Sequence, residues 1–164
     1  MYGAIIGDVI GSRFEFSNRA IRKDFTLFKD KCCFTDDSVM SVAIAKALVE
    51  VGKDASIKDI KKAIIKSMQE YGRKYPNAGY GANFRYWLLD EDPKPYGSYG
   101  NGSAMRVSAV GHLYDSLKRT LEVAKATAEV SHNHIEGIKG AQATAATIYL
   151  ARTGKSTEEI LDYI

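Results

Sequence analysis

Apolar residues recur at helical spacing along most of the chain, and this period constrains the fold more than any other feature. Residues three or four apart lie on one face of an α-helix, so each apolar stripe predicts a helix packed against a core. The best strand candidate is residues 25–28, and it is short. The sequence therefore predicts an all-α fold, an orthogonal multi-helix bundle. Helices are expected over residues 38–51, 56–71, 103–117, 120–130 and 137–152.

Capping residues and helix breakers indicate where several of these helices begin and end. Ser56 with Asp59, and Ser156 with Glu159, have the spacing of a capping pair at a helix N-terminus. The second pair opens a further helix close to the last residue, Ile164. Prolines and glycines predict two loops, over residues 75–81 and 90–102.

Composition and charge are those of an ordinary globular protein. The 164 residues are 45% hydrophobic and 26% charged, with a net charge of +3. Lysine and arginine are spread without a dense basic stripe, and apolar runs fall well short of the roughly 20 residues that span a bilayer. We therefore expect neither a nucleic-acid partner nor a membrane span. The adjacent Cys32 and Cys33 predict free thiols, interpreted as small buried hydrophobes, in a reducing, cytoplasmic setting.

The first cluster that can carry chemistry is the segment GDVIGSRFE, residues 7–15. Asp8 and Glu15 are seven residues apart, which is two helical turns, so they can share one face. The alternative is the polar face of an N-terminal helix whose glycines allow close packing.

The second cluster is Thr35-Asp36-Asp37, which immediately precedes a long apolar helix. A helix N-terminus offers free N–H groups and partial positive charge, so the cluster fits a helix cap. The same hydroxyl and carboxylates are oxygen donors of the kind that Mg²⁺ or Ca²⁺ prefers. Three donors do not fill an octahedral shell of about six, so such a site needs water or a distant segment.

The third cluster is a glycine-rich loop that opens a helix, YGNGSAMR over residues 99–106. Free N–H groups at a helix start bind anions such as a diphosphate, and small residues let a ligand approach the backbone. An Asn-Gly turn followed by a helix cap is the alternative.

Two further groups have simpler explanations. Ser131-His132-Asn133-His134 lies between two predicted helices, where histidines two apart can bind a metal or merely form a turn. An aromatic group is interpreted as part of the core, and its members are Tyr80, Phe84, Tyr86 and Trp87.

Taken in order along the chain, these segments resemble the ADP-ribosylglycohydrolase family. The matching pieces are GAIIGDVIGSRFEF, FTDDSVMSVAIAKAL, GYGANFRYWL, GNGSAMR and SHNH. They span nearly the whole chain, and FTDDS followed by GNGSAMR is the most specific combination.

The resemblance implies an all-α fold with a Mg²⁺-containing cleft and ADP-ribose or an ADP-ribosylated substrate as the partner. It implies that Thr35, Asp36 and Asp37 are metal ligands, and that Asp36 and Glu15 are the catalytic carboxylates. Some family members place that glutamate elsewhere. His132 matches a histidine that lines the ligand cleft. The residues expected to contact ADP-ribose are those of the glycine loop: Gly100, Asn101, Gly102, Ser103 and Met105.

One departure from the family pattern concerns its second metal motif, Asp-x-Asp-Thr. The only Asp-x-Asp here is Asp90-Glu91-Asp92, which is followed by Pro93 and lies in the wrong region. We therefore expect residues 1–164 to be the N-terminal part of one family domain, with its C-terminal part missing. This chain alone is expected to bind Mg²⁺ weakly and to be inactive. The alternative is a non-catalytic ADP-ribose-binding protein, or a structural relative resembling the J1 crystallins.

Overall fold

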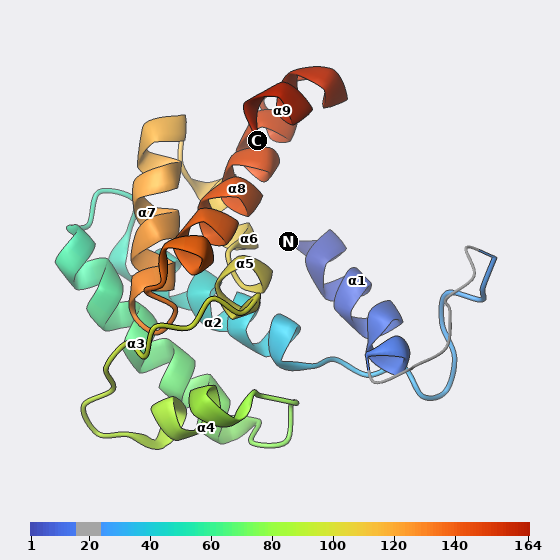
Figure 1. Cartoon of the computed structure of the whole chain (residues 1–164), viewed down its shortest axis with the longest axis vertical. Helices are drawn as coiled ribbons and strands as arrows, with labels where there is room; N and C mark the ends of the chain where they lie inside the picture. Colours follow the sequence, from blue (N-terminus) through green and yellow to red (C-terminus); the bar gives the residue numbers. More distant parts are fainter. Residues whose placement is uncertain (16–23) are drawn as a thin grey trace.

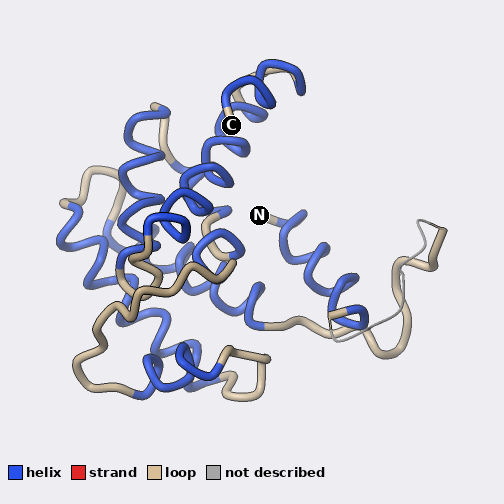
Figure 2. Tube along the Cα trace, in the orientation of Figure 1, coloured by secondary structure: helices blue, strands red, loops and turns tan. Residues whose placement is uncertain are grey.

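The computed structural model describes residues 1–15 and 24–164, and the regular elements among them are all helical (Figure 1 and Figure 2). The prediction of an all-α fold is confirmed. Within the described ranges no strand forms, and residues 25–28 belong to a loop. Phe16, the last residue of the first motif, lies outside the described residues. The helices are α1 (Tyr2–Gly11), η1 (Ser12–Phe14), α2 (Asp36–Val51), α3 (Ile57–Lys74), α4 (Ala82–Leu89), α5 (Gly102–Met105), α6 (Ser108–Leu113), α7 (Leu117–Glu129), α8 (Ile135–Arg152) and α9 (Thr157–Tyr163).

Two helix pairs form the body of the molecule. Helix α2 packs along α3, and α7 packs along α8, while the short helices α5 and α6 pack against α8. The two pairs run in different directions, as expected of an orthogonal bundle (Figure 1). Helices α1 and α9 lie at the periphery, and neither contains a buried residue. In the described part of the chain, no helix combines the length and the apolar character needed to cross a membrane.

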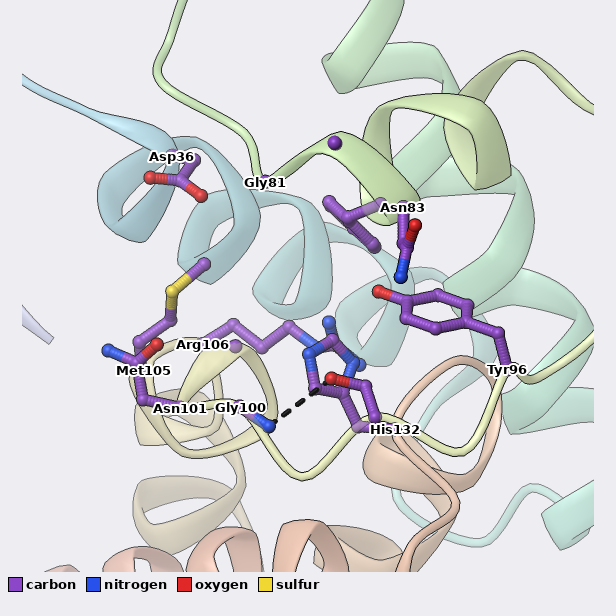
Figure 3. Close-up of a pocket in the computed structure, with 13 residues that line it drawn as sticks. Asp36, Gly81, Asn83, Tyr96, Gly100, Asn101, Met105, Arg106 and His132 are labelled. Atoms are coloured by element: carbon purple, nitrogen blue, oxygen red, sulfur yellow. Dashed lines mark hydrogen bonds between the residues drawn. The ribbon is translucent and has the colours of Figure 1, made fainter.

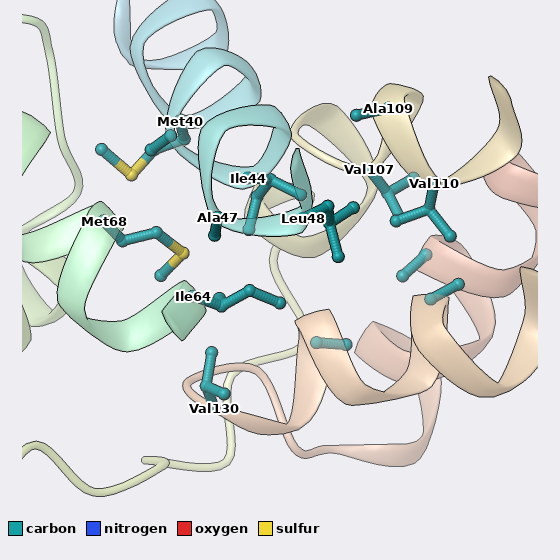
Figure 4. Packing of buried hydrophobic residues seen from close by; sticks show 14 of the residues in the cluster. Met40, Ile44, Ala47, Leu48, Ile64, Met68, Val107, Ala109, Val110 and Val130 are labelled. Carbon is teal, nitrogen blue, oxygen red and sulfur yellow. The ribbon is translucent and has the colours of Figure 1, made fainter. Parts of the chain in front are cut away.

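The core runs through helices from α2 to α8, and Figure 4 shows the part of it where α2, α3 and α6 meet. Ile44 and Leu48 of α2 face Ile64 of α3, and all three side chains are at most 1% exposed. Val107 and Val110 close the same cluster from the other side. The predicted apolar stripes of the helices over residues 38–51 and 56–71 therefore point inward, as their spacing requires.

Both predicted capping pairs form. The Ser56 hydroxyl accepts from the Asp59 backbone N–H at 3.2 Å. At α9, Ser156 and Glu159 each accept from the other's backbone N–H, which completes a capping box. These interactions lie within four residues, so the local sequence is enough to predict them.

The single helix predicted over residues 103–117 is wrong, because the chain turns twice in this segment. Helix α5 ends at Met105, and Arg106 and Val107 take φ,ψ of −95°,−3° and −86°,−1° before α6 starts. The turn directs the Arg106 side chain into the interior. Ser116 then caps α7 by accepting from the Arg119 backbone N–H at 3.3 Å, so α7 begins at residue 117 rather than 120.

Two interpretations of buried side chains also need correction. Tyr86 is 77% exposed, although Tyr80, Phe84 and Trp87 of the same aromatic group are buried. Residue 86 lies on the outer face of the short helix α4, whose inner face packs against α3. Cys33 is exposed and Cys32 is half-buried, so neither is a core residue. Both cysteines are free thiols, as predicted.

Candidate functional site

A pocket of about 340 Å³ opens where the starts of α2 and α4 meet the glycine loop before α5 (Figure 3). Its floor carries Arg106 and His132, and its rim carries Asp36 and the glycine-loop backbone. The full lining comprises Asp36, Gly81, Ala82, Asn83, Phe84, Tyr96, Ser98, Gly100, Asn101, Gly102, Met105, Arg106 and His132. Backbone, aromatic and polar groups thus converge on one concave surface, as is usual for small-molecule sites.

A second cleft, of about 560 Å³, lies beside the first and shares Asn101 with it. It runs between α1 and the turn that opens α2, and Thr35, Asp37 and Glu15 line it. The predicted ADP-ribose-contacting residues and the predicted carboxylates are therefore adjacent in space, although 65 residues separate Asp36 from Asn101 in sequence.

Asp8 of α1 determines the geometry of the Thr35–Asp37 turn. Its carboxylate accepts from the Thr35 backbone N–H at 2.8 Å, the Thr35 hydroxyl at 2.6 Å and the Ser38 backbone N–H at 3.1 Å. Thr35 itself makes no side-chain cap, so Asp8 caps α2 from another helix. The Asp36 N–H donates to the Ala78 carbonyl at 2.7 Å, which ties the turn to the loop before α4.

Carboxylates crowd this turn and raise one another's pKa. Burial, followed by the charges of Asp37 and Glu15, raises the pKa of Asp36 to about 6. Burial and then Asp8 raise the pKa of Asp37. Burial also raises the pKa of Glu15, with Asp37 and Asp8 as further causes. Like charges held this close oppose ionisation, and a divalent cation relieves that opposition.

The three predicted metal ligands do not all line one cleft, because Asp36 lines the glycine-loop pocket whereas Thr35 and Asp37 line the second cleft. Thr35, Asp36 and Asp37 offer oxygen ligands of the kind Mg²⁺ takes. Among residues 1–15 and 24–164, no group of three or more histidine, cysteine, aspartate or glutamate side chains is arranged to enclose a metal ion. The assignment of Thr35, Asp36 and Asp37 as metal ligands therefore stays a prediction.

The glycine loop lies directly against His132. A Cβ added to Gly102 would lie 2.6 Å from His132 Nε2, so a glycine is the only residue that leaves the ring in place. The Gly100 N–H donates to the Ser98 hydroxyl at 3.2 Å, which shapes the loop (Figure 3). The Ser103 hydroxyl is buried and donates to the Gly137 carbonyl at 2.7 Å, so this side chain anchors the loop to α8.

His132 is buried in the pocket wall and is held neutral. Its ring is 5% exposed and lies against Phe84 and Tyr96, with ring centroids 6.2 and 5.6 Å away. Burial, and then the charge of Arg106, lowers its pKa to about 4. His134, two residues further on, is not in the pocket lining and caps α8, accepting from the Glu136 N–H at 3.2 Å.

Several pocket residues had no role in the sequence-based prediction. Arg106 belongs to the GNGSAMR segment, but nothing in the local pattern indicates that its side chain turns inward. Tyr96 comes from the predicted loop over residues 90–102, and Asn83 from a segment for which no helix was predicted; neither was given a ligand role. Phe84 was expected in the core and is buried, yet it also lines the pocket.

Comparison with known proteins gives the class of the molecule. The family model described as ADP-ribosylglycohydrolase matches residues 1–164, which is the whole chain. The chain belongs to the ADP-ribosylglycohydrolase family, as its motifs indicated.

Three curated proteins similar to this chain are ADP-ribosylhydrolases ARH3 from different vertebrates. The Bos taurus protein is 30% identical over 186 residues, covering 96% of this chain and 50% of the relative. The Homo sapiens protein is 29% identical with the same coverage, and the Mus musculus protein is 32% identical over 140 residues, covering 77% of this chain and 36% of the relative. The chain thus spans about half the length of the curated relatives it matches.

Proposed function

We propose that this chain supplies the ADP-ribose-binding portion of a Mg²⁺-dependent hydrolase. The complete enzyme cleaves the glycosidic bond between ADP-ribose and an acceptor, either a protein side chain or a small molecule. One observation carries the proposal: the glycine-loop pocket and the carboxylate-lined cleft adjoin at Asn101. A ligand that fills both has its diphosphate and ribose in reach of the loop and its anomeric carbon in reach of the carboxylates.

The glycine loop binds the substrate in this proposal. The backbone of Gly100, Asn101 and Gly102 approaches the ADP-ribose closely, because two of these residues lack a side chain. Met105 supplies apolar contact, and His132 supplies a hydrogen bond from the pocket floor. Ser103 contributes through its backbone, since its hydroxyl is engaged by the Gly137 carbonyl.

The carboxylates perform the chemistry. Cleavage at the anomeric carbon of ribose develops oxocarbenium character, which nearby carboxylates stabilise. Glu15, whose pKa is raised, is suited to accept a proton from an attacking water near neutral pH. Thr35, Asp36 and Asp37 would hold the Mg²⁺, which when bound orients ribose hydroxyls and water. Asp36 lines the glycine-loop pocket, and its neighbours Thr35 and Asp37 line the adjoining cleft.

We further propose that residues 1–164 alone are inactive. Octahedral Mg²⁺ takes about six oxygen ligands, and the described turn offers donors from one side. The family's second motif, Asp-x-Asp-Thr, has no counterpart here, and the relatives are about twice as long. Misplacement of reacting atoms by about 1 Å can cost on the order of 10²-fold in rate.

The free cysteines support a reducing, cytoplasmic location.

The test is release of ADP-ribose from a modified substrate with Mg²⁺ present. We expect turnover by the complete protein, none by residues 1–164, and loss of turnover in the complete protein carrying Asp36→Ala with its fold intact. Robust turnover by residues 1–164 that Asp36→Ala abolishes would show that the second motif is dispensable.

A non-catalytic role is the second candidate, and it gains support if the complete protein also lacks an Asp-x-Asp-Thr segment. In that case the protein binds ADP-ribose, or serves as a structural relative resembling the J1 crystallins. Submicromolar to micromolar ADP-ribose binding by the complete protein, without turnover on any ADP-ribosylated substrate, would establish the binding role. If the complete protein neither binds ADP-ribose nor turns over an ADP-ribosylated substrate, the structural role is the remaining explanation.

A further inference from the structure

Arg106 is a buried cation without a carboxylate partner in the described part of the chain. Its side chain is 0% exposed beneath the pocket floor. Nη2 donates to the Thr127 carbonyl at 2.8 Å and to the Ser131 hydroxyl at 2.9 Å, while Nε and Nη1 have no hydrogen-bond partner. Burying an uncompensated charge is strongly unfavourable, so its position calls for a specific role.

The second bond of Nη2 occupies one of the two acceptor lone pairs of the Ser131 hydroxyl. A guanidinium is a donor only, so the Ser131 oxygen accepts from it. The hydroxyl hydrogen then remains to be donated, and the neighbouring acceptor is His132 Nδ1, 2.9 Å from the same oxygen. The Ser131 hydroxyl has no other hydrogen-bond partner among the described residues.

The state of His132 follows from this chain of donors. A neutral imidazole has one N–H and one bare nitrogen, and the partner of one nitrogen decides which is which. If Nδ1 accepts from Ser131, the proton resides on Nε2. That nitrogen is the one that faces Gly102 at the glycine loop. In this arrangement Arg106, Ser131 and His132 form a hydrogen-bonded relay from the interior to the pocket.

We propose that Arg106 and Ser131 are positioning residues that fix His132 as the neutral Nε2–H tautomer, so that the pocket presents one hydrogen-bond donor beside Gly102. This donor suits an oxygen of the ligand, such as a phosphate or ribose oxygen, and the identity of that ligand rests on the proposed function. The buried guanidinium contributes to the relay in two ways. It can only donate to Ser131, and its positive charge disfavours a second proton on His132.

The tautomer is measured directly by ¹⁵N–¹H correlation of the imidazole nitrogens in residues 1–164. The chain has three histidines, and a His132→Gln variant assigns the signals. A bare imidazole nitrogen resonates well downfield of a protonated one. We expect Nδ1 bare and Nε2 protonated in the wild type, unchanged between pH 5 and pH 8. A proton on Nδ1 in the wild type would overturn the proposal, and that result requires no variant to fold.

Ser131→Ala and Ser131→Thr form the matched pair. The alanine variant removes the donor to Nδ1, so His132 should populate both tautomers, whereas threonine keeps the hydroxyl and the wild-type spectrum. Identical tautomers in the wild type and Ser131→Ala would exclude the relay. Arg106→Lys retains a donor and a charge, and it should keep the wild-type tautomer if it folds.

Calorimetric titration with ADP-ribose separates the relay from the proposed ligand. We expect Ser131→Ala to weaken binding about tenfold, the effect of one hydrogen bond, and Ser131→Thr to bind as the wild type does. If the expected tautomers are found but the chain does not bind ADP-ribose, the proposed ligand is wrong and the relay is still supported. ADP-ribose binding that is equal in the wild type and Ser131→Ala would show that the His132 donor does not contact this ligand.

Discussion

Asp36, a predicted metal ligand, should destabilise the folded chain near neutral pH when no metal is bound. Its carboxylate is half-buried beside Asp37 and within the influence of Glu15, and its pKa rises from 3.8 to about 6. Between those pH values the folded chain holds a proton that the unfolded chain has released. The free energy of unfolding therefore falls as pH rises through this window, and the penalty is complete at pH 7.

Asp36→Asn should accordingly stabilise the metal-free chain at pH 7. We expect a gain on the order of 1 kcal/mol, because solvent screens a half-exposed carboxylate. Urea unfolding at pH 7 and at pH 4 measures it, and the gain should disappear at pH 4. Asp54→Asn, at an exposed carboxylate, is the control and should change nothing. A variant less stable than the wild type at pH 7 would contradict the proposed crowding.

Gly102 tests the close approach of the glycine loop to His132. A methyl group on Gly102 would meet Nε2 at 2.6 Å and displace the ring from the pocket floor. Gly102→Ala should therefore reduce ADP-ribose affinity at least tenfold while the far-ultraviolet circular dichroism is unchanged.

The matched control for that variant is Gly140→Ala in α8. Its added Cβ would meet the Ala104 Cβ at 3.7 Å, an ordinary contact outside the pocket lining. This variant should bind ADP-ribose as the wild type does. Equal ADP-ribose affinity in both variants would show that the glycine loop only begins helix α5 and does not contact the ligand.

Two serine caps with the same local chemistry stabilise helices that differ in how much of the core they bury. Ser56 opens α3, which buries Ile60, Ile64 and Met68 in the core. Ser156 opens α9, which buries no residue. Loss of a cap weakens its helix by about 1 kcal/mol in each case, but only α3 is coupled to the core.

Ser56→Ala should therefore lower the melting temperature by about 3 °C. Ser156→Ala should leave the melting temperature unchanged while amide hydrogen exchange becomes faster in α9. Thermal unfolding and exchange followed by mass spectrometry provide the two measurements. An equal drop in melting temperature for both variants would show that α9 unfolds together with the core.

At the scale of the whole molecule, the core lies in α2 to α8 and α1 is attached through polar contacts. Helix α1 exposes Tyr2 and Ile6 and is joined to the α2 turn by the three hydrogen bonds of Asp8. The N-terminal ammonium adds a contact to His112 Nε2 at 3.1 Å. A helix held in this way can detach without unfolding the body.

Asp8→Ala should release α1 and leave the remaining fold intact. We expect limited proteolysis to cleave within residues 1–15 faster than in the wild type, while the protected fragment starting near α2 survives. Asp54→Ala is the exposed control. Unchanged cleavage would mean that apolar contacts, rather than Asp8, hold α1 in place.

Local chemistry in the sequence determined the class of fold and the composition of the site. Helical spacing predicted α2, α3, α7 and α8 to within a few residues, because a 3.6-residue period is a property of neighbouring positions. Ser56 and Ser156 each accept from a backbone N–H in the first turn of the helix they cap, so neighbouring residues alone predict these caps. The motifs indicated the family, and the pocket collects Asp36, Gly100, Asn101, Gly102, Met105 and His132 as a set.

Contacts between distant segments decided the rest. Asp8 caps α2 across 27 residues, and Arg106 enters the interior because the chain breaks between α5 and α6 to follow α8. Tyr86 faces outward although its neighbours Phe84 and Trp87 on α4 are buried, and Cys33 is exposed on the loop before α2. None of these outcomes is encoded in a period or a cap. Each depends on which surface a neighbouring helix covers, and that is settled only when the helices pack together.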